Sequence, residues 1–568
     1  MYDAMTLDEL KRLGEAPEWM TEEGYATIAR GYLLEGETPL GMYERVAHSA
    51  ASYYADSSFW YAKFFDVLWK NWLCPASPVL SNLGTSRGLP ISCNSIHAGD
   101  SVSSIFEKSH ELAMLSKNGA GVGIYLGDIR GRGAPIKGNG KSEGIIPWAK
   151  VFDTTTASVS QGATRRGASA IYLPIEHLDI EEFINLRRPT GDVNRRCLNL
   201  NHGICISDDW MKSLIDGDKE KRRIWQSVLT ARMETGEPYL FFTDAVNRQN
   251  PDCYRANSLS VKTSNICTEI FLHTDPEHSF VCCLSSLNLM KWEEWKDSDL
   301  PQVATRFLDA VLSEYINKAV GTPGLQCSVR SAIKGRAIGI GVLGWHSLLQ
   351  SKNLPFDSFD SMALNAAIFR TIRRGAEEET AKLAQELGEP EWCKGFGRRN
   401  THLLAVAPTV SNSTISGGYS AGIEPLAANV FAFKSAKGTF IRKNPALEAV
   451  LEELGRNTPD IWKQINEQSG SIQGLSFLDK HTKEVFLTAR EINQHAIVRQ
   501  AGQRQRWIDQ GQSVNLFFGV NSDPKYIHEV HLEAWKQGLK TLYYLRAEGV
   551  LRGDLASRSP DECTACEG

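Results

Sequence analysis

Short apolar runs that alternate with helical stretches constrain the fold of this chain more than any other feature of its sequence. Each run is β-rich and lies between segments with helical patterning, which is typical of strands separated by helices. The runs occupy 121–127, 169–175, 202–207, 238–243, 338–344 and 403–408. Because no Pro-, Gly- or Ser-rich linker interrupts them, we expect one large α/β domain rather than several small ones.

The first 92 residues have a different pattern. Apolar residues recur there at three- and four-residue spacing in LDELKRLG, GYATIARGYLL and YERVAHSAASYYA, which predicts helices. The chain as a whole is 42% hydrophobic and 23% charged, which excludes collagen-like, coiled-coil and wholly disordered proteins. Its formal net charge of −5 provides no chain-wide attraction for nucleic acid or an anionic membrane, so an anionic ligand must be held by local groups.

The sequence indicates neither a targeting segment nor a membrane span. Its beginning lacks the basic and then apolar order of a signal peptide, and no apolar run reaches the roughly 18 residues of a spanning helix. We therefore expect a cytoplasmic protein with reduced thiols, whose paired cysteines serve catalysis, redox chemistry or metal binding. The polar stretch after residue 546 predicts a mobile tail.

Three short motifs are similar to known binding motifs but lack the spacing or the neighbouring elements that those sites require. Gly339–Gly344 has the G-x-G-x-x-G spacing of a dinucleotide site, but the run itself is expected to be a strand rather than to follow one. Gly140–Ser142 is similar to the end of a Walker A loop, whose first glycine would fall at Pro135. His528 and His531 are spaced too closely for the H-E-x-x-H zinc motif. None of the three decides the function.

Twelve cysteines in 568 residues are too few for a disulfide scaffold, and they are unevenly placed. Asn265, Cys267 and Glu269 alternate just before an apolar run, and a strand would put all three side chains on one face. An amide, a thiol and a carboxylate on one face could orient hydroxyls, abstract hydrogen or attack as a nucleophile, and act as a general base. The alternative is a buried cysteine in a core strand with polar neighbours.

The remaining cysteine motifs each admit two interpretations. The adjacent Cys282 and Cys283 could be two small buried hydrophobic residues, and Cys93 is equally ambiguous on its own. Cys563 and Cys566 form a Cys-x-x-Cys near the end of the chain. No second Cys/His pair lies near them to complete a four-ligand zinc site, so a dithiol that shuttles electrons fits a polar tail better.

Taken together, these segments resemble those of the large, catalytic subunit of class I ribonucleotide reductase. The matching motifs are Ser92-Cys93, Asn265-x-Cys267-x-Glu269, Cys282 in C-C-L-S-S-L-N-L, A-P-T-V-S-N-S-T (407–414) with G-I-E-P (422–425), Leu542-Tyr543-Tyr544, and Cys563 with Cys566. They occur in the family's order, which is far more specific than any one motif. The resemblance implies an oxidoreductase that reduces ribonucleoside diphosphates to 2′-deoxyribonucleotides, the precursors of DNA.

The fold implied by the resemblance is α/β: a ten-stranded α/β barrel of two antiparallel five-stranded half-barrels, with an internal finger loop that carries the radical cysteine. The expected domains are an N-terminal helical region (1–92), the catalytic barrel (93–546) and a flexible C-terminal redox tail (547–568). Only 92 residues precede Cys93, and they match the helical lead-in. We therefore expect the compact form that lacks the family's N-terminal ATP cone.

The resemblance also implies a role for each residue of the finger loop. Cys267 would carry a thiyl radical that abstracts the 3′-hydrogen of the ribose. Glu269 would accept the 3′-OH proton, and Asn265 would orient the hydroxyls. No metal ligands are implied in this chain.

Two cysteine pairs would supply the electrons. Cys93 and Cys282 would be oxidised to a disulfide; the L-S-S-L-N-L register selects Cys282, with Cys283 as the fallback. Cys563 and Cys566 would then reduce that disulfide by thiol–disulfide exchange. The resemblance implies thioredoxin or glutaredoxin as the external reductant.

Tyr543 and Tyr544 would carry the radical to Cys267 from a metal-containing small subunit, so this chain itself would bind no radical cofactor. Without the other motifs, an aromatic pair on a buried strand would be the preferred interpretation. The pair argues against a cobalamin-dependent (class II) reductase, whose radical forms beside the cysteine.

Two other classes of protein remain as alternatives. A glycyl-radical enzyme would need a radical glycine loop near the C-terminus, where Gly549 and Gly553 lie in the polar tail. A nucleotide-binding regulatory protein without enzymatic activity would instead hold zinc on Cys563 and Cys566.

Substrate phosphates are expected at the turn that follows the apolar run at 403–407, where backbone N–H groups and hydroxyls bind an anion. The residues of this segment are Pro408, Thr409, Val410, Ser411, Asn412 and Ser413. Ser77 and Ser92 match other substrate-contacting positions of the family. Val410 departs from relatives that have a polar side chain at this position.

Asp100, Arg130 and Lys137 match positions that hold the specificity effector, a deoxynucleoside triphosphate or ATP. Gln161–Gly167 would link that site to the substrate base, although a Gly-rich basic loop is also an ordinary surface loop. We expect the small subunit, thioredoxin or glutaredoxin and the substrate as partners, together with a homodimer, and neither nucleic acid nor a membrane.

Overall fold

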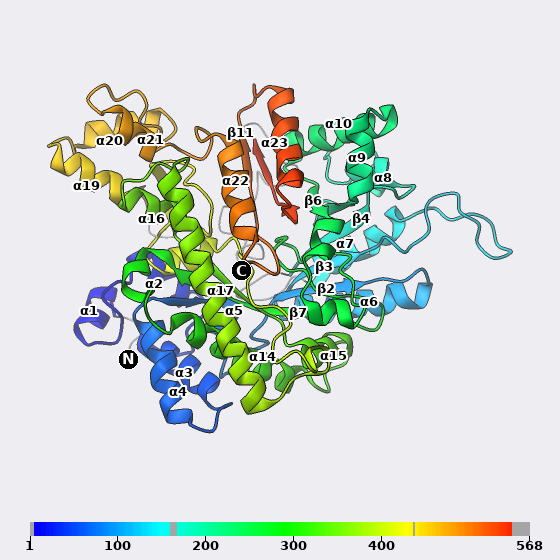
Figure 1. Cartoon of the computed structure of the whole chain (residues 1–568), viewed down its shortest axis with the longest axis horizontal. Coiled ribbons are helices and arrows are strands. Elements are labelled where there is room, and N and C mark those ends of the chain that lie inside the picture. Colours follow the sequence, from blue (N-terminus) through cyan, green and yellow to red (C-terminus); the bar gives the residue numbers. More distant parts are fainter. Residues whose placement is uncertain (1–4, 160–166, 436–437, 548–568) are drawn as a thin grey trace.

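The computed structural model describes residues 5–159, 167–435 and 438–547. An inner sheet is surrounded by helices, and the N-terminal helices lie together at one side of it (Figure 1). Among the described residues, no helix is long and apolar enough to cross a membrane.

The N-terminal helices form where the spacing of apolar residues predicted them. They are α1 (Leu7–Arg12), α2 (Glu22–Ala29), α3 (Pro39–Ala51) and α4 (Ser57–Trp69). Each begins after a residue whose side chain accepts a backbone N–H of the first turn, namely Thr6, Thr21, Thr38 and Asp56. Phe64 of α4 packs edge-on against Phe307, with ring centroids 5.4 Å apart, and so anchors these helices to the barrel.

The first half of the barrel consists of five parallel strands, in keeping with the predicted α/β class. They are β2 (Cys93–His97), β3 (Gly121–Tyr125), β4 (Ala168–Pro174), β5 (Leu200–Ile206) and β6 (Tyr239–Phe242). Nearly all of their residues are buried, because helices cover one face and the barrel interior the other.

The second half of the barrel runs antiparallel to the first. Strand β7 (Phe280–Asn288) pairs antiparallel with β2 and parallel with β8 (Ile338–Leu343). The run at 403–408 is not a continuous strand; it is bridged in parallel to β8 through Leu404 and to Gln512 through Val406.

The barrel closes through the last described segment of the chain. β11 (Leu516–Phe518) pairs parallel with β13 (Leu545–Ala547), and β12 (Thr541–Leu542) pairs antiparallel with β6. With the two bridged segments counted, two antiparallel halves of five complete the predicted ten-stranded barrel. A further strand, β1 (Leu73–Pro75), pairs antiparallel with β7.

Helices cover the outside of the barrel, and the long α17 crosses it (Figure 1). From the start of the barrel to β7 they are α5 (Ser77–Asn82), α6 (Val102–Lys117), α7 (Ile146–Val159), α8 (Ile180–Ile184), α9 (Asp208–Asp216), α10 (Lys219–Thr235), α11 (Thr243–Arg248) and α12 (Asp252–Ala256), with the 3-10 helix Val193–Arg195. After β7 they are α13 (Trp292–Trp295), α14 (Leu300–Ala319), α15 (Gln326–Gly335), α16 (Trp345–Ser351), α17 (Phe359–Leu387), α18 (Val410–Ile415), α22 (Gln494–Gln505) and α23 (Pro524–Lys536), with the 3-10 helices Leu289–Lys291 and Glu391–Cys393.

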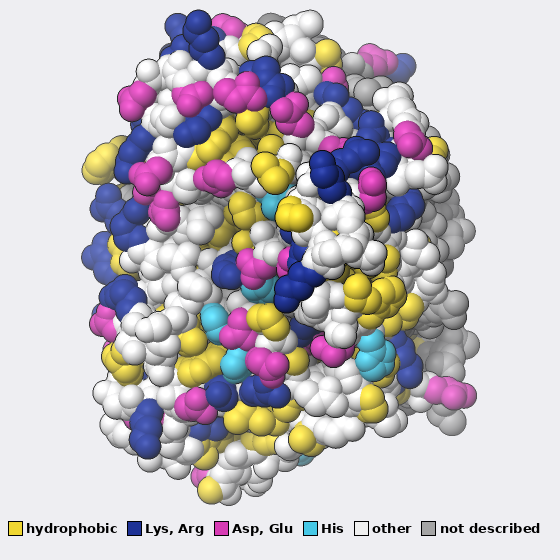
Figure 2. All heavy atoms as spheres, turned by 90° about the vertical axis from the view of Figure 1, so that its right-hand side faces the viewer, with side chains coloured by type: hydrophobic (Ala, Val, Ile, Leu, Met, Phe, Trp, Pro, Cys, Tyr) yellow, Lys and Arg dark blue, Asp and Glu magenta, His cyan; other side chains and the backbone are white. Residues whose placement is uncertain are grey.

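A smaller apolar cluster lies outside the main core. It is formed by α19 (Pro445–Glu453), α20 (Pro459–Glu467) and α21 (Lys480–Val485), next to the hairpin of β9 (Val430–Ser435) and β10 (Gly438–Lys443). On the face of the molecule shown in Figure 2, basic and acidic side chains are interspersed, in keeping with the balanced composition.

Asp309 of α14 is a buried carboxylate that joins the helix layer to the residue at 336, just before β8, and to the residues at 399–400. Arg336 donates to its Oδ1 at 2.8 Å and Arg399 to its Oδ2 at 3.0 Å, and the amide of Asn400 adds a third bond. Burial alone would raise the pKa of this carboxyl, but the two guanidinium groups hold it below its usual value.

Replacing Asp309 with alanine should lower the free energy of unfolding by about 3–5 kcal/mol, because the buried Arg336 would lose its counter-ion. Urea unfolding followed by tryptophan fluorescence measures the change. Asp209→Ala is the matched control, since its ion pair with Lys212 is exposed and contributes about 1 kcal/mol or less. Equal losses in the two variants would contradict a structural role for the buried pair.

Candidate active site

Cys93 and Cys282 lie opposite each other at the junction of the two half-barrels. Cys93 is the first residue of β2, and the antiparallel register places its Cα directly across from that of Cys282 in β7. Opposed Cα atoms in such pairs lie about 4.5–5.5 Å apart, inside the range of about 4.4–6.8 Å that a disulfide spans. Both residues are buried free cysteines. The pair can therefore lose two electrons and form a disulfide with little movement of the strands.

The alternation of side chains along β7 separates the two adjacent cysteines. Successive side chains point to opposite faces of a sheet. The thiol of Cys283 donates to the carbonyl of Leu308 in α14 at 3.2 Å, whereas the thiol of Cys282 accepts from Gln510 Nε2 at 3.4 Å. Burial raises the pKa of both thiols, so both are protonated at neutral pH. This geometry favours Cys282 over Cys283 as the partner of Cys93.

Asn265, Cys267 and Glu269 lie on a buried loop and not on the strand that their alternation predicted. The chain turns at Thr268, which has a left-handed φ of 66°. Asn265 Oδ1 accepts the backbone N–H groups of Glu269 and Ile270, both at 3.1 Å, and so replaces the hydrogen bonds of a strand ladder. The predicted strand is wrong, although the turn still brings the three residues together.

This loop reaches the interior face of the first half-barrel. At Gly123 in β3, a Cβ atom would lie only 1.8 Å from the carbonyl oxygen of Ser264, so that position admits glycine alone. Tyr172 of β4 donates from its hydroxyl to the carbonyl of Asn265 at 2.6 Å. The loop is therefore an internal finger, as the family resemblance implied.

Residues 510–513 of the second half-barrel hold the finger from the other side. Gln510 Oε1 accepts the backbone N–H of Phe271 at 3.1 Å. Ser513 Oγ lies 2.5 Å from the carbonyl of Cys267 and 3.2 Å from Glu269 Oε2. The sequence did not single out Gln510 or Ser513, because neither belongs to a recognisable motif and their partners are about 240 residues away.

The site retains polar groups that could bind a ligand. Asn265 Nδ2 and Asn412 Oδ1 have no hydrogen-bond partner among the described residues, although both side chains are buried. Glu269 is only 1% exposed. An unsatisfied buried polar group costs about 1–3 kcal/mol, and a hydroxyl-bearing ligand would relieve this cost.

The predicted phosphate segment is a turn followed by a short helix. Thr409 has a left-handed φ of 59°, and α18 begins at the next residue. The Thr409 hydroxyl already accepts the backbone N–H of Gly422 at 2.7 Å, and the Val410 side chain is 43% exposed. The end of α18 contacts β1, since Ser416 Oγ lies 3.0 Å from Cys74 Sγ.

Ser77 and Ser92 lie next to strands of the barrel sheet. Ser77 begins α5, immediately after β1, and its hydroxyl accepts from the Tyr32 hydroxyl at 2.8 Å. Ser92 directly precedes β2, and its carbonyl accepts the backbone N–H of Gly121 at 2.7 Å. Both serines are buried beside strands that carry or contact the thiol pair.

Tyr543 and Tyr544 belong to a cluster of three tyrosines. Their ring centroids are 4.3 Å apart, and Tyr239 of β6 lies 4.8 Å from the first and 5.1 Å from the second. Asn201 Nδ2 lies within hydrogen-bonding distance of the hydroxyls of Tyr544 (2.9 Å) and Tyr239 (2.8 Å). Tyr543 is buried and Tyr544 partly exposed, so the cluster extends from the interior toward the surface. The sequence did not identify Tyr239, because one aromatic residue in a strand is uninformative.

Two of the predicted effector residues contact each other. Arg130 Nε donates to Asp100 Oδ2 at 2.8 Å, and this ion pair is partly exposed. Lys137 is exposed on a nearby turn, which is closed by a bridge between Pro135 and Lys141. Residues 161–166 of the predicted linking loop lie outside the described residues, as do Cys563 and Cys566.

A ten-stranded α/β barrel with a thiol on an internal finger and two cysteines opposed across two strands is the arrangement that the resemblance to an oxidoreductase implied. The chain matches the ribonucleotide reductase barrel domain over residues 91–221, 218–396 and 390–545, and the all-alpha domain of the same enzyme over 19–88. It therefore belongs to the ribonucleotide reductase large-subunit family.

Individual relatives agree with this assignment. A Frog virus 3 protein whose name contains the words ribonucleoside-diphosphate reductase large subunit is 39% identical, and the match covers 89% of this chain and 92% of the relative. The large subunit of Invertebrate iridescent virus 3 is 34% identical over 96% of this chain and 98% of its own. The class Id ribonucleotide reductase alpha subunit of Actinobacillus ureae superposes with a TM-score of 0.87, at 40% identity and with 94% and 98% of the two chains covered.

Mild oxidation of the reduced protein should form a disulfide between Cys93 and Cys282 and leave Cys283 as a free thiol. Peptide mapping by mass spectrometry after alkylation identifies the bond. Cys283→Ser should form it at an unchanged rate, whereas Cys282→Ser should not form it. A bond between Cys93 and Cys283 would show that the strand register is different.

Proposed function

We propose that this chain is the catalytic subunit of a ribonucleoside-diphosphate reductase in which Cys267 carries the radical and Cys93 with Cys282 supplies the electrons. The family reaction, reduction of ribonucleotides to 2′-deoxyribonucleotides, is the activity of this enzyme. One observation carries the assignment of residues: Gln510 contacts both the finger and the thiol of Cys282, so the three cysteines share one buried site.

The first step is hydrogen abstraction. A thiyl radical on Cys267 takes the hydrogen atom from C3′ of the ribose, which leaves a carbon radical and a Cys267 thiol. The carboxylate of Glu269 accepts the proton of the 3′-OH, and the free amide N–H of Asn265 orients a ribose hydroxyl. These transfers make departure of the 2′-oxygen feasible, because hydroxide itself is a poor leaving group.

The second step is reduction. The 2′-oxygen leaves as water with a proton from one thiol of the pair, and C2′ gains its new hydrogen from the other. The pair loses two electrons and becomes a disulfide, which the opposed Cα atoms of Cys93 and Cys282 favour. Cys267 returns its hydrogen atom to C3′ and becomes a radical again, and Glu269 returns its proton. Protonated thiols are what this step needs, and burial keeps Cys282 in that form.

The substrate is held by local polar groups. The diphosphate is expected at the turn made by Pro408, Thr409, Val410, Ser411, Asn412 and Ser413, with Ser77 and Ser92 as additional contacts. The left-handed turn at Thr409, which is followed directly by the start of α18, supports this placement. Asp100, Arg130 and Lys137 are the proposed effector site for a deoxynucleoside triphosphate or ATP.

The radical is proposed to arrive from a small subunit through Tyr544 and then Tyr543. A groove of about 670 Å³ between α10 and α23 is the proposed docking site for that subunit; Leu229 and Met233 contribute to its apolar wall. The groove and the tyrosines share a supporting helix, because Arg232 of α10 donates to the carbonyl of Tyr543 at 3.0 Å. The groove is remote from the thiols, which suits a protein partner rather than the nucleotide.

The steps that reduce the buried disulfide again are assigned from the chemistry of thiol–disulfide exchange. Cys563 and Cys566 are proposed to reduce the buried disulfide and to be reduced by thioredoxin or glutaredoxin. The corresponding division of the chain is a helical region at 1–92, a catalytic barrel at 93–546 and a redox segment at 547–568.

Cys267→Ser should abolish turnover of all four ribonucleoside diphosphates, because a serine hydroxyl does not form the radical that a thiol forms. The assay measures deoxynucleotide product with dithiothreitol and a metallated small subunit. Cys327→Ser, at a partly exposed thiol outside the barrel interior, is the matched control and should retain activity. Product formed by Cys267→Ser would rule out the proposed mechanism.

Tyr544→Phe should abolish turnover but leave the affinity for the small subunit unchanged, because the ring remains while the oxidisable hydroxyl is lost. Leu229→Glu in the groove should weaken small-subunit binding by about 10-fold or more, since it buries a charge at an apolar contact. Sedimentation and turnover assays measure the two effects. Full activity of Tyr544→Phe with either a small subunit or adenosylcobalamin would eliminate the tyrosine route.

A further inference from the structure

A second cluster of ligand-type side chains lies on the segment that connects the finger to β7. It consists of His273, Asp275 and His278. His273 follows Cys267 by six residues, and His278 precedes Cys282 by four. The proposed catalytic roles use none of the three, and no sequence motif pointed to them.

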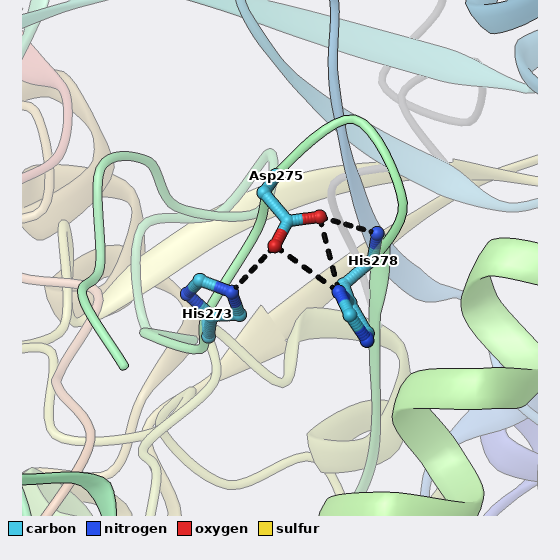
Figure 3. A group of neighbouring side chains, drawn as sticks. All are labelled: His273, Asp275 and His278. Atoms are coloured by element: carbon cyan, nitrogen blue, oxygen red, sulfur yellow. Dashed lines mark hydrogen bonds and ion pairs between the residues drawn. The ribbon is translucent and has the colours of Figure 1, made fainter. Parts of the chain in front are cut away.

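The two imidazole rings converge on one carboxylate, as Figure 3 shows. His273 Nε2 lies 3.0 Å from Asp275 Oδ2, and His278 Nδ1 lies 3.0 and 3.1 Å from the two oxygens of the same carboxylate. Two ligands at about 2.0–2.1 Å from a tetrahedral zinc ion are about 3.3 Å apart. The distances from each histidine nitrogen to the Asp275 carboxylate are within a few tenths of an ångström of that value, and all three ligand atoms lie within 4.8 Å of one another.

The surroundings of His273 favour a cation between the rings. Its Nδ1 lies 2.8 Å from the carbonyl of Ser260, and its Nε2 faces the carboxylate of Asp275. Both neighbours only accept hydrogen bonds, whereas a neutral imidazole offers a single N–H. The ring must therefore carry a positive charge or place the lone pair of Nε2 on a cation. A backbone carbonyl that fixes Nδ1–H is the usual support of a histidine bound to metal through Nε2.

The loop holds these ligands in place without help from a metal. Asp275 Oδ1 accepts the backbone N–H groups of Glu277 and His278, both at 2.8 Å. The ring of Trp392 packs against both imidazoles, at 6.0 Å from His273 and 5.6 Å from His278. Such support is what a preorganised metal site requires.

Exposure leaves room for one more ligand. The side chains of His273 and His278 are 12% and 18% exposed, whereas that of Asp275 is 36% exposed. Three protein ligands and a water molecule form an open zinc site.

We propose that His273 Nε2, His278 Nδ1 and a carboxylate oxygen of Asp275 bind one divalent first-row transition metal ion, with Zn²⁺ as the representative ion. Two imidazoles and one carboxylate favour such an ion over Mg²⁺ or Ca²⁺, which prefer oxygen ligands. The ion would fasten the segment between the radical cysteine and the reducing cysteine, and it would take no part in electron transfer.

Isothermal titration of the full chain with ZnCl₂ tests the proposal. Cys563 and Cys566 are first replaced by serine, because thiols would compete for zinc. We expect one equivalent of Zn²⁺ to bind and to raise the melting temperature. Asp275→Asn and His273→Gln should each weaken binding at least about 10-fold, whereas His481→Gln, at an exposed histidine elsewhere, should not change it. Asp275→Asn retains an oxygen for the N–H groups of Glu277 and His278, so it preserves the turn.

Cobalt(II) in place of zinc gives an independent spectroscopic test, on the chain in which His273, Asp275 and His278 are unchanged and Cys563 and Cys566 are serine. A site of nitrogen and oxygen ligands should give visible d–d bands without the strong thiolate-to-metal charge-transfer band. Absence of binding, binding that survives both substitutions, or a thiolate charge-transfer band would each overturn the proposal. Cys93, Cys267 and Cys282 are intact in every variant, so loss of zinc binding is distinguishable from failure of the proposed mechanism.

Discussion

The whole site depends on burying a polar loop inside an apolar barrel without leaving its backbone groups unpaired. Buried N–H and C=O groups need partners, and the finger, which has a backbone bond from Gly511 N–H to the Glu269 carbonyl, has no strand ladder to provide the rest. Side chains do so instead: Asn265 binds two N–H groups of its own turn, and Gln510 binds a third from the opposite half of the barrel. Gly123 gives the loop the space to pass. The position of Cys267 is a consequence of these contacts.

The antiparallel junction of the two half-barrels is the second feature that determines the geometry of the site. Because β2 and β7 run in opposite directions, residues that are 189 positions apart face each other as a cross-strand pair. The same pairing sends the neighbouring Cys283 to the helix layer, where a backbone carbonyl accepts a hydrogen bond from its thiol. Burial keeps the thiol of Cys282 protonated, which suits a group that gives hydrogen to a substrate rather than attacking one.

The segments around the barrel connect this interior to the rest of the chain. The tyrosine cluster extends from the buried Tyr543 to the partly exposed Tyr544, and Asn201 links Tyr239 to Tyr544. On another side, the loop with His273, Asp275 and His278 spans the short distance in sequence between the finger and β7. Order in that loop therefore bears directly on the spacing of Cys267 and Cys282.

The sequence by itself determined the α/β class, the N-terminal helices and the strands β3, β4, β5, β6 and β8, because periodicity is a local property. It also pointed to the cysteines, the tyrosine pair and the turn proposed to bind phosphate, because these stand in ordered motifs. The tertiary structure showed that residues 265–269 form a turn rather than the strand that their alternation predicted, and its register places Cys282, which the family motif had selected, opposite Cys93. It alone revealed Gln510, Ser513, Tyr239 and the two histidines beside Asp275. Their roles arise from contacts between distant segments or from the folding of a loop, and neither leaves a periodic signal in the sequence.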